Sequence, residues 1–298
     1  MSNAINELGP SRQRTSINWG TIVTMVVFHA ASIAALFMFS WQGVASVFIL
    51  WWVSGSLGIG MGFHRLLTHR GYKTPKWVEY TLTVCGMLAL EAGAINWVAT
   101  HRIHHAHTEG PEDPHTPRDG TWWSHIGWIL RGTAQRYDEA TLRRYAPDLM
   151  RDPVHVFLNR WFFLPVVLLG ALLLALGGWS LLLWGLFLRT TLGLHATWLV
   201  NSATHTWGRR RFATDDDSTN NWLIALLTFG EGWHNNHHAH PTSARHGLRW
   251  YEIDLNWYGI RALEFLGLAR SVKTVAATTP LPRARLAPPA AEELSNAA

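Results

Sequence analysis

The sequence predicts an all-α integral membrane protein with four transmembrane helices, and three observations carry this prediction. The 298 residues are 48% hydrophobic and only 15% charged, whereas about one quarter of the residues in ordinary soluble domains are charged. Tryptophan is abundant, at 18 residues, as in proteins anchored at membrane interfaces. Four stretches also approach the roughly twenty apolar residues that cross a bilayer. We predict spans at about 18–40, 43–63, 161–177 and 179–200.

These four stretches form two pairs with short connections. The connections are Trp41-Gln42-Gly43 and Gly177-Gly178-Trp179, and neither contains Lys or Arg. Almost all basic residues lie instead in the N-terminal tail, between Arg65 and Arg160, and after Thr206. By the positive-inside rule these regions, both termini among them, are expected in the cytoplasm. A bacterial inner membrane is the expected location.

Eight histidines fall into three tight clusters, and His205 follows Asn201 by four residues. The clusters are His64-Arg-Leu-Leu-Thr-His69, His101-Arg-Ile-His104-His105 and His234-Asn-Asn-His237-His238. Imidazole suits zinc, iron, copper and nickel, and so many imidazoles exceed the three or four protein ligands of one zinc ion. Two metal ions sharing these ligands is the economical interpretation.

Helical geometry allows the clustered side chains to converge. Residues three to five apart lie within about one turn, and the third histidine of each His-x-x-His-His cluster is rotated by ~100° from the second. Each cluster can therefore serve two metals. All clusters emerge on one side of the predicted membrane. Any single histidine is more often structural, and His29 and His195, inside the spans, are assigned that role.

Carboxylates near the clusters are candidates to orient the ligating imidazoles. Glu109, Asp113 and Glu231 are nearest in sequence, with a solvated or capping role as the alternative. The run Asp215-Asp216-Asp217-Ser218 is interpreted as a solvated helix cap. The apolar stretch from Val78 to Val98 is predicted to be re-entrant or interfacial, because a crossing there would separate the clusters.

The chain divides into three parts on this interpretation. A polar N-terminal tail covers residues 1–17, and a membrane domain covers residues 18–268. Residues 269–298 contain Thr-Pro and Ala-Pro-Pro-Ala-Ala sequence without apolar periodicity. Such sequence cannot bury enough surface to offset the entropy of ordering, so a disordered C-terminal tail is predicted.

Several longer motifs carry a family resemblance over roughly residues 18–268. They are Gly-Phe-His-Arg-Leu-Leu-Thr-His-Arg at 62–70, Asp-Pro-His at 113–115, Trp-Trp-Ser-His-Ile-Gly-Trp at 122–128, Thr-Trp-Leu-Val-Asn-Ser-Ala-Thr-His at 197–205 and Gly-Glu-Gly-Trp-His-Asn-Asn-His-His at 230–238. The chain resembles the membrane delta-9 fatty acyl desaturases. It is similar to the animal stearoyl-CoA desaturases and more so to bacterial and cyanobacterial members, which desaturate acyl-CoA or the acyl chains of glycerolipids.

The resemblance implies four transmembrane helices beneath a cytoplasmic helical cap that holds a non-haem di-iron centre. It also implies O2-dependent insertion of a cis double bond, expected at delta-9. Nine histidines would bind the two iron ions, and an asparagine would act through water. One iron would take His64, His101, His234 and His238 with Asn201 nearby, and the other would take His69, His104, His105, His205 and His237.

The resemblance further implies a bent substrate tunnel shaped by Trp and Thr. The matching positions are Trp97, Thr197 and Trp198, and Glu91 is included as a substrate-binding candidate. Interfacial anchoring is the alternative role of the tryptophans. Animal acyl-CoA members carry an Arg-Asp pair where this chain has Ala99-Thr100. The acyl carrier, CoA or glycerolipid, therefore stays open, and Arg102, Arg118, Arg131 and Arg136 are candidates for binding phosphates.

Electrons are expected from an external ferredoxin, rubredoxin or cytochrome b5-type donor, because the chain lacks the His-Pro-Gly-Gly pattern of a fused cytochrome b5 domain. Arg209-Arg210-Arg211 is a candidate docking site for an acidic donor or for anionic lipid. The net charge of +5 is scattered, without the basic stripe that binds nucleic acid. A membrane hydroxylase of the alkane or sterol type is the alternative function, and a metal transporter is a second.

Overall fold

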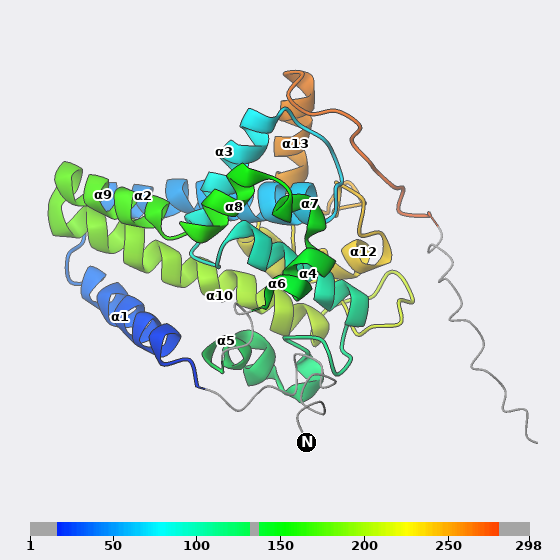
Figure 1. Cartoon of the computed structure of the whole chain (residues 1–298), viewed down its shortest axis with the longest axis horizontal. Helices are drawn as coiled ribbons and strands as arrows, with labels where there is room; N and C mark the ends of the chain where they lie inside the picture. The colour runs from blue at the N-terminus through cyan, green and yellow to red at the C-terminus, as the bar shows by residue number, and fades with distance from the viewer. Residues whose placement is uncertain (1–16, 132–136, 280–298) are drawn as a thin grey trace, which may run out of the picture.

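The computed structural model describes residues 17–131 and 137–279, which fold into helices joined by short connections. Within these two ranges β-structure is limited to isolated bridges, so the predicted all-α class is confirmed there. The predictions for residues 1–16, for Arg136 and for residues 280–298 lie outside the described residues. Figure 1 shows an elongated bundle of apolar helices at one end and shorter helices gathered at the other.

The bundle contains the apolar segments of the sequence. Its elements are α1 (Trp19–Ala35), α2 (Trp41–Trp51), the π-helical η2 (Trp52–Thr68), α9 (Leu164–Leu182), the π-helical η5 (Leu183–Leu188) and α10 (Arg189–Ser202). Two continuous helical runs are long and apolar enough to cross a membrane, Trp41–Thr68 with 28 residues and Leu164–His205 with 42 residues. The helix α1 is apolar but shorter. The helices α1, α2 and α9 all pack against η5.

The longer run consists of two helices separated by a break and is not one continuous helix. Gly177 and Gly178 leave helical geometry, and Gly178 has a φ of 62°, a conformation that favours glycine. The chain therefore turns at the predicted second connection. The first connection lies earlier than predicted, before Trp41, because the Ser40 side chain accepts a hydrogen bond from Gly43 N (3.0 Å) and starts α2 there.

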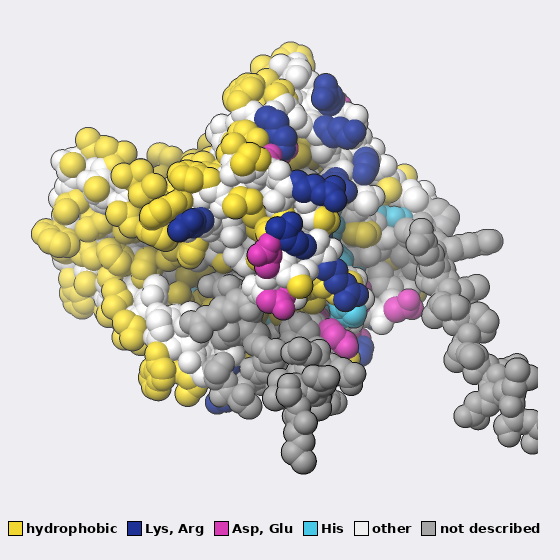
Figure 2. All heavy atoms as spheres, in the orientation of Figure 1, with side chains coloured by type: hydrophobic (Ala, Val, Ile, Leu, Met, Phe, Trp, Pro, Cys, Tyr) yellow, Lys and Arg dark blue, Asp and Glu magenta, His cyan; other side chains and the backbone are white. Residues whose placement is uncertain are grey.

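The other end carries the shorter helices. They are α3 (Lys76–Met87), α4 (Ala94–His107), η3 (Pro117–Asp119), η4 (Trp123–Gly127), α5 (Trp128–Leu130), α6 (Glu139–Tyr145), α7 (Pro147–Met150), α8 (Pro153–Arg160), η6 (Ala203–His205), α11 (Trp222–Leu227), α12 (His234–Ala239) and α13 (Leu255–Phe265). Figure 2 shows hydrophobic side chains gathered over the bundle end, whereas Lys and Arg side chains concentrate over the opposite end. The surface is thus divided as a membrane boundary requires.

The apolar stretch from Val78 to Val98 is two helices, α3 and α4, separated by residues 88–93. The buried Arg189 side chain of α10 donates to Leu88 O (2.7 Å) and to Ser54 Oγ (3.3 Å). A Cβ atom at Gly58 of η2 would lie 2.3 Å from the backbone N of Gly86, so η2 and α3 approach closely through glycine. The stretch folds back on η2 instead of continuing as one long helix.

The largest apolar core lies between η2, α3, α4 and α13. It extends beyond the predicted end of the domain at residue 268. Lys73 and Arg270 form an antiparallel bridge, and Lys273 N donates to Gly71 O (2.8 Å). Residues 269–273 therefore belong to the folded part, because their backbone groups pair with the chain that follows η2.

Candidate metal centre and apolar cavity

All nine predicted histidines converge in two adjacent groups where η2, α4, η6 and α12 meet. The five-histidine group contains His64, His69, His101, His105 and His237, and the four-histidine group contains His104, His205, His234 and His238. Within each group the ligand nitrogens all lie within 4.8 Å of one another. The clusters predicted from the sequence thus form one site with room for two metal ions.

This grouping corrects the division of ligands implied by the family resemblance. His234 and His238 lie with His104 and not with His64, whereas His105 lies with His64. The reason is helical phase. Residues four apart lie almost on one line of an α-helix, so α12 presents His234 and His238 together and α4 separates His105 from its neighbour His104.

The π-helical end of η2 explains the remaining pair. Hydrogen bonds from residue i to i+5 set residues five apart on one face, and His69 N donates to His64 O (3.1 Å). The two imidazole centroids lie 4.8 Å apart. In a regular α-helix the same spacing would turn these rings away from each other.

The ring nitrogens fit a metal better than they fit one another. His237 Nε2 lies 2.9 Å from His105 Nε2 and 3.1 Å from His64 Nε2. A neutral imidazole carries a single N–H. Where several ring nitrogens face one another, some of the contacts therefore bring two lone pairs together instead of forming a hydrogen bond. Nitrogen atoms about 3 Å apart are what a metal ion with roughly 2.1 Å bonds gathers around itself. The buried Nε2 atoms of His69 and His104 have no hydrogen-bond partner among the described residues.

Burial keeps these rings neutral, which is the form that binds metal. Burial, followed by repulsion from neighbouring imidazoles, lowers the pKa of His101, His105, His234 and His237 well below the ordinary value of histidine. Burial also lowers the pKa of His238 to about 4. The site therefore presents uncharged nitrogen donors at neutral pH.

Four of the ligand histidines form a hydrogen bond to a carboxylate through the ring nitrogen that faces away from the site. The pairs through Nδ1 are His64 with Glu231, His104 with Asp113 (2.9 Å), His205 with Glu109 (2.9 Å) and His238 with Asp216 (2.8 Å). A proton on Nδ1 leaves the Nε2 lone pair free for a metal. The orienting role considered for Glu109, Asp113 and Glu231 is thus supported by direct contacts.

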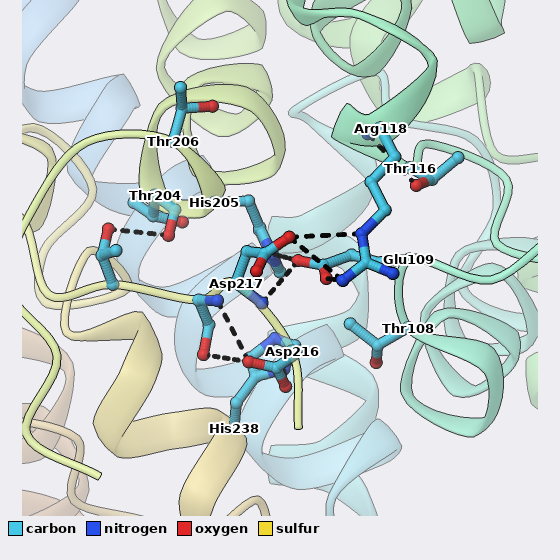
Figure 3. A network of polar contacts seen from close by, with 12 residues as sticks. Thr108, Glu109, Thr116, Arg118, Thr204, His205, Thr206, Asp216, Asp217 and His238 are labelled. Atoms are coloured by element: carbon cyan, nitrogen blue, oxygen red, sulfur yellow. Dashed lines mark hydrogen bonds and ion pairs between the residues drawn. The ribbon is translucent and has the colours of Figure 1, made fainter. Parts of the chain in front are cut away.

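Asp216 was wrongly interpreted as part of a solvated cap. Besides His238, it accepts hydrogen bonds from Ser218 N (3.0 Å) and Thr214 Oγ1 (2.8 Å). Figure 3 shows that the same loop reaches Glu109, whose Oε1 accepts from Asp217 N (2.8 Å). The loop therefore supports His205 and His238 together, and no local sequence spacing links it to either histidine.

An apolar cavity of about 760 Å³ borders the centre. His101 and Asn201 line its metal end, and side chains of α1, α9, η5 and α10 form much of its wall. The four candidate substrate residues all line it; they are Glu91, Trp97, Thr197 and Trp198. Asn201 thus lies where the cavity meets the histidines.

Glu91 connects α4 and α10, two of the helices that form this wall. Its Oε1 accepts from Thr197 Oγ1 (2.8 Å) and its Oε2 accepts from Trp97 Nε1 (3.0 Å). Burial raises the pKa of Glu91 to about 7, and the two hydrogen bonds partly oppose this rise. The polar clamp made by these three residues, the Glu91 clamp, interrupts an otherwise apolar wall.

The two histidines predicted inside the spans lie outside both metal groups. His195 Nε2 lies 3.0 Å from His29 Nε2, and His195 Nδ1 lies 3.0 Å from His125 Nε2. The rings of His125 and His195 pack edge-on against Trp198. They join α1, α10 and η4 behind the cavity wall, consistent with the structural role expected for His29 and His195.

Two arginines considered for phosphate binding are engaged within the fold. Arg102 donates to Asp148 Oδ1 (2.7 Å) and to Leu67 O (2.6 Å). Arg118 pairs with Glu109 Oε2 (2.8 Å) and also with Asp217, as Figure 3 shows. These contacts use their guanidinium groups to hold the metal-site loops.

Comparison with known proteins places this site among the fatty acid desaturases. A model of that family, described as fatty acid desaturase, matches residues 39–270. The sn-1 stearoyl-lipid 9-desaturase of Anabaena variabilis is 49% identical over 265 residues, which cover 87% of this chain and 95% of that protein. The sn-2 palmitoyl-lipid 9-desaturase of Nostoc sp. (strain 36) is 44% identical over 274 residues, covering 91% and 96%.

Similarity also extends to a relative named for a different acyl carrier. The acyl-CoA C20 Delta5-desaturase of Anemone leveillei is 46% identical over 247 residues, covering 82% of this chain and 78% of that protein. Overall identity therefore does not separate relatives named for lipid-linked substrates from those named for acyl-CoA.

Replacing Asp216 by Ala is expected to weaken metal retention by about 10- to 100-fold, because His238 loses the carboxylate that fixes its ring. Asp215→Ala is the matched control, since Asp215 is exposed. Metal content is measured by inductively coupled plasma mass spectrometry during dialysis against a graded chelator. Equal retention by the two variants would show that Asp216 does not orient a ligand.

Replacing Glu91 by Gln is expected to flatten the pH dependence of thermal stability. The folded pKa of about 7 lies above the ordinary value of 4.5, so the stability linked to the Glu91 proton is present below pH 4.5 and is lost as pH rises through 7. The full effect is ~3 kcal/mol. Melting temperatures of wild type, Glu91→Gln and the exposed control Glu139→Gln are compared across this range. Parallel curves for all three would contradict the assignment.

Proposed function

The chain belongs to the fatty acid desaturase family, and from this premise we propose that it is an O2-dependent acyl-lipid delta-9 desaturase. As a family member it is an oxidoreductase. The reaction would remove one hydrogen from each of two adjacent methylenes and leave a cis double bond. Two electrons and two protons complete the reduction of O2 to two waters. The matched relatives are desaturases, which favours this function over the hydroxylase and transporter alternatives.

The observation that carries the proposal is the position of the histidines at the end of the cavity. His101 of the five-histidine group lines a cavity of about 760 Å³ whose wall is mostly apolar, and the four-histidine group adjoins the five-histidine group. This volume falls in the range of sites that bury a whole ligand. An unactivated methylene chain has no group for acid–base catalysis, so the chemistry requires a strong metal-based oxidant beside an apolar channel.

We propose that two non-haem iron ions are the cofactor. The five-histidine group and the four-histidine group would each hold one, and Asn201, which lines the cavity together with His101, would act through water. When bound, the iron pair would supply the reduction of O2. The contribution of the chain is to fix the imidazoles through Glu231, Asp113, Glu109 and Asp216 before any metal arrives.

Trp97, Thr197, Trp198 and Glu91 are proposed to position the acyl chain. Trp198 is 3% exposed and packs with Trp123, Trp128 and Leu194, so its ring cannot move aside easily. The Glu91 clamp fixes Trp97 and the neighbouring Thr197. A rigid wall determines which methylene pair reaches the metals, because the chain slides only as far as the cavity allows.

A glycerolipid is the proposed acyl carrier. Buried Ala99 and Thr100 stand where the animal acyl-CoA members carry a charged pair. Arg102 and Arg118 are committed to Asp148 and Glu109. The relatives from Anabaena variabilis and Nostoc, which are matched over 95% and 96% of their length, are named for lipid-linked acyl chains, whereas the acyl-CoA relative is matched over 78%. These observations favour membrane lipid over CoA.

The proposed topology has four spans beneath a cytoplasmic cap. The spans are α1, α2 with η2, α9 as far as its break at Gly177, and the rest of α9 with η5 and α10. Exposed apolar residues such as Phe37, Leu168 and Leu176 support lipid contact along the bundle. Both termini and the metal centre would face the cytoplasm of a bacterial cell, with the protein in the inner membrane.

An external ferredoxin, rubredoxin or cytochrome b5-type protein is proposed to supply the electrons. Arg209-Arg210-Arg211 is a weaker docking candidate than its charge suggested. Arg211 is paired with Glu252, and Arg210 donates to Thr214 Oγ1 (3.1 Å). The Lys and Arg side chains over the cap in Figure 2 are the better candidate for steering an acidic donor.

Expression of the wild type in a host without this activity is expected to give a cis-9 monoene in the glycerolipids. His237→Ala should lower that product by more than about 100-fold, since a metal ligand is lost while the bundle stays intact. His107→Ala is the matched control, because His107 lies on α4 outside both groups. Products are identified by gas chromatography and mass spectrometry with the double bond mapped. A hydroxylated product, or normal product from His237→Ala, would overturn the proposal.

Trp198→Leu is expected to shift the preference between stearoyl and palmitoyl chains by about tenfold, because the cavity gains space for additional methylenes. Trp250→Leu is the control, as Trp250 is 89% exposed. The measurement is the ratio of products from cells fed both acids. An unchanged ratio in Trp198→Leu would assign Trp198 to helix anchoring alone.

A further inference from the structure

A second, much smaller cavity of about 60 Å³ also reaches the metal centre. It shares Trp97, His101, Thr197 and Asn201 with the large cavity. The rest of its wall comes from α2 and η2, from α10 and from the chain between α11 and α12. It is therefore a separate approach to the same centre.

The inner end of this small cavity touches both metal groups. His64 and His101 belong to the five-histidine group, and His234 belongs to the four-histidine group. The large cavity reaches only His101 among these nine histidines. Of the two cavities, the small one thus opens where the two metals would lie side by side.

The outer end lies against the apolar bundle. Trp51 and Phe229 pack edge to face with centroids 6.0 Å apart, and Gly55 lies between them. A Cβ atom on Gly55 would come within 2.9 Å of Trp51 Cδ1 and 3.1 Å of Phe229 Cε2. No side chain larger than that of glycine fits here without displacing these rings, and the cavity ends at Trp51, Gly55 and Phe229, which are half-buried.

The size of the small cavity selects its occupant. It exceeds the ~10–15 Å³ that one water needs, yet it is far too small for an acyl chain. Polar side chains such as Asn201, Thr228 and Glu231 line part of it, whereas Ile59, Ala196 and Val200 line another part with carbon. In the carbon-lined part a water would find few hydrogen-bond partners, and a small apolar molecule that dissolves in hydrocarbon fits better there.

We propose that the small cavity is the dioxygen site of the enzyme and its entry route from the bilayer. The inference rests on the proposed function, in which O2 is a substrate. An acyl chain in the large cavity would block access along that side. A separate apolar route lets dioxygen reach both metal groups while the chain is bound.

Two kinds of variant test this route. Val200→Phe would fill the cavity with a ring, and Gly55→Ala would add a methyl group against Trp51 and Phe229 at its outer end. Leu199→Phe and Gly193→Ala are the matched controls; neither residue lines either cavity, and a Cβ on Gly193 meets nothing within 4 Å.

The expected kinetic result is specific to dioxygen. Val200→Phe and Gly55→Ala should raise the KM for O2 by about tenfold without raising the KM for acyl lipid. The controls should behave as wild type. An unchanged KM for O2 in the folded variants would overturn the proposal, and Gly55→Ala decides it if Val200→Phe does not fold.

Xenon gives a readout independent of turnover, because it binds dry apolar cavities. Crystals of wild type under xenon pressure should show xenon between Val200 and Gly55, and crystals of Val200→Phe should not. Ordered water in its place would overturn the dioxygen route. Absence of desaturated product from wild type would instead overturn the proposed function, so the two failures are distinguishable.

Discussion

The site depends on one buried guanidinium. Arg65 is fully buried next to His64 in η2, and it donates to Glu231 Oε1 (2.8 Å), to Asp254 Oδ2 (3.0 Å) and to Ala244 O (2.8 Å). Burial alone would raise the pKa of Glu231, but Arg65 and the neighbouring histidines lower it well below its usual range. Removing one partner from such a buried pair costs roughly 3–5 kcal/mol. The apolar run that ends in η2 is therefore fixed in register against the segment that carries α12.

The same carboxylate that balances Arg65 also orients a ligand. Glu231 Oε1 accepts from Arg65 and from Asn256 Nδ2 (2.7 Å), whereas Oε2 meets His64. Glu109 works similarly, with Arg118 on one oxygen and His205 on the other. Each carboxylate is held by contacts that exist without a metal. The imidazoles are thereby preorganised, and the ions would bind without paying for rearrangement of these side chains.

Most of the nine histidines could be predicted from spacing, because helical periodicity brings residues three or four apart to a common volume. Their division between metals could not, since it depends on the π-helical turn that pairs His64 with His69 and on the crossing of α4 with α12. Asp216 escaped prediction because 22 residues separate it from His238 and a run of three aspartates is typical of solvent. The orienting role of Glu231 was easier to suspect, since it lies three residues before His234.

On each of two helices, a residue of the cavity wall is followed at intervals of four by residues at the metal site. The rows are Trp97, His101 and His105 on α4, and Thr197, Asn201 and His205 on α10 and η6. Both rows begin at the Glu91 clamp, and steps of four residues over two turns span about 12 Å along each helix. The Trp97 and His101 rings stack with centroids 5.1 Å apart. The reach from the clamp to the metals is thus set by the rigid rise of two helices. In the proposed function, this rise would fix the position of the double bond more firmly than the lengths of the loops.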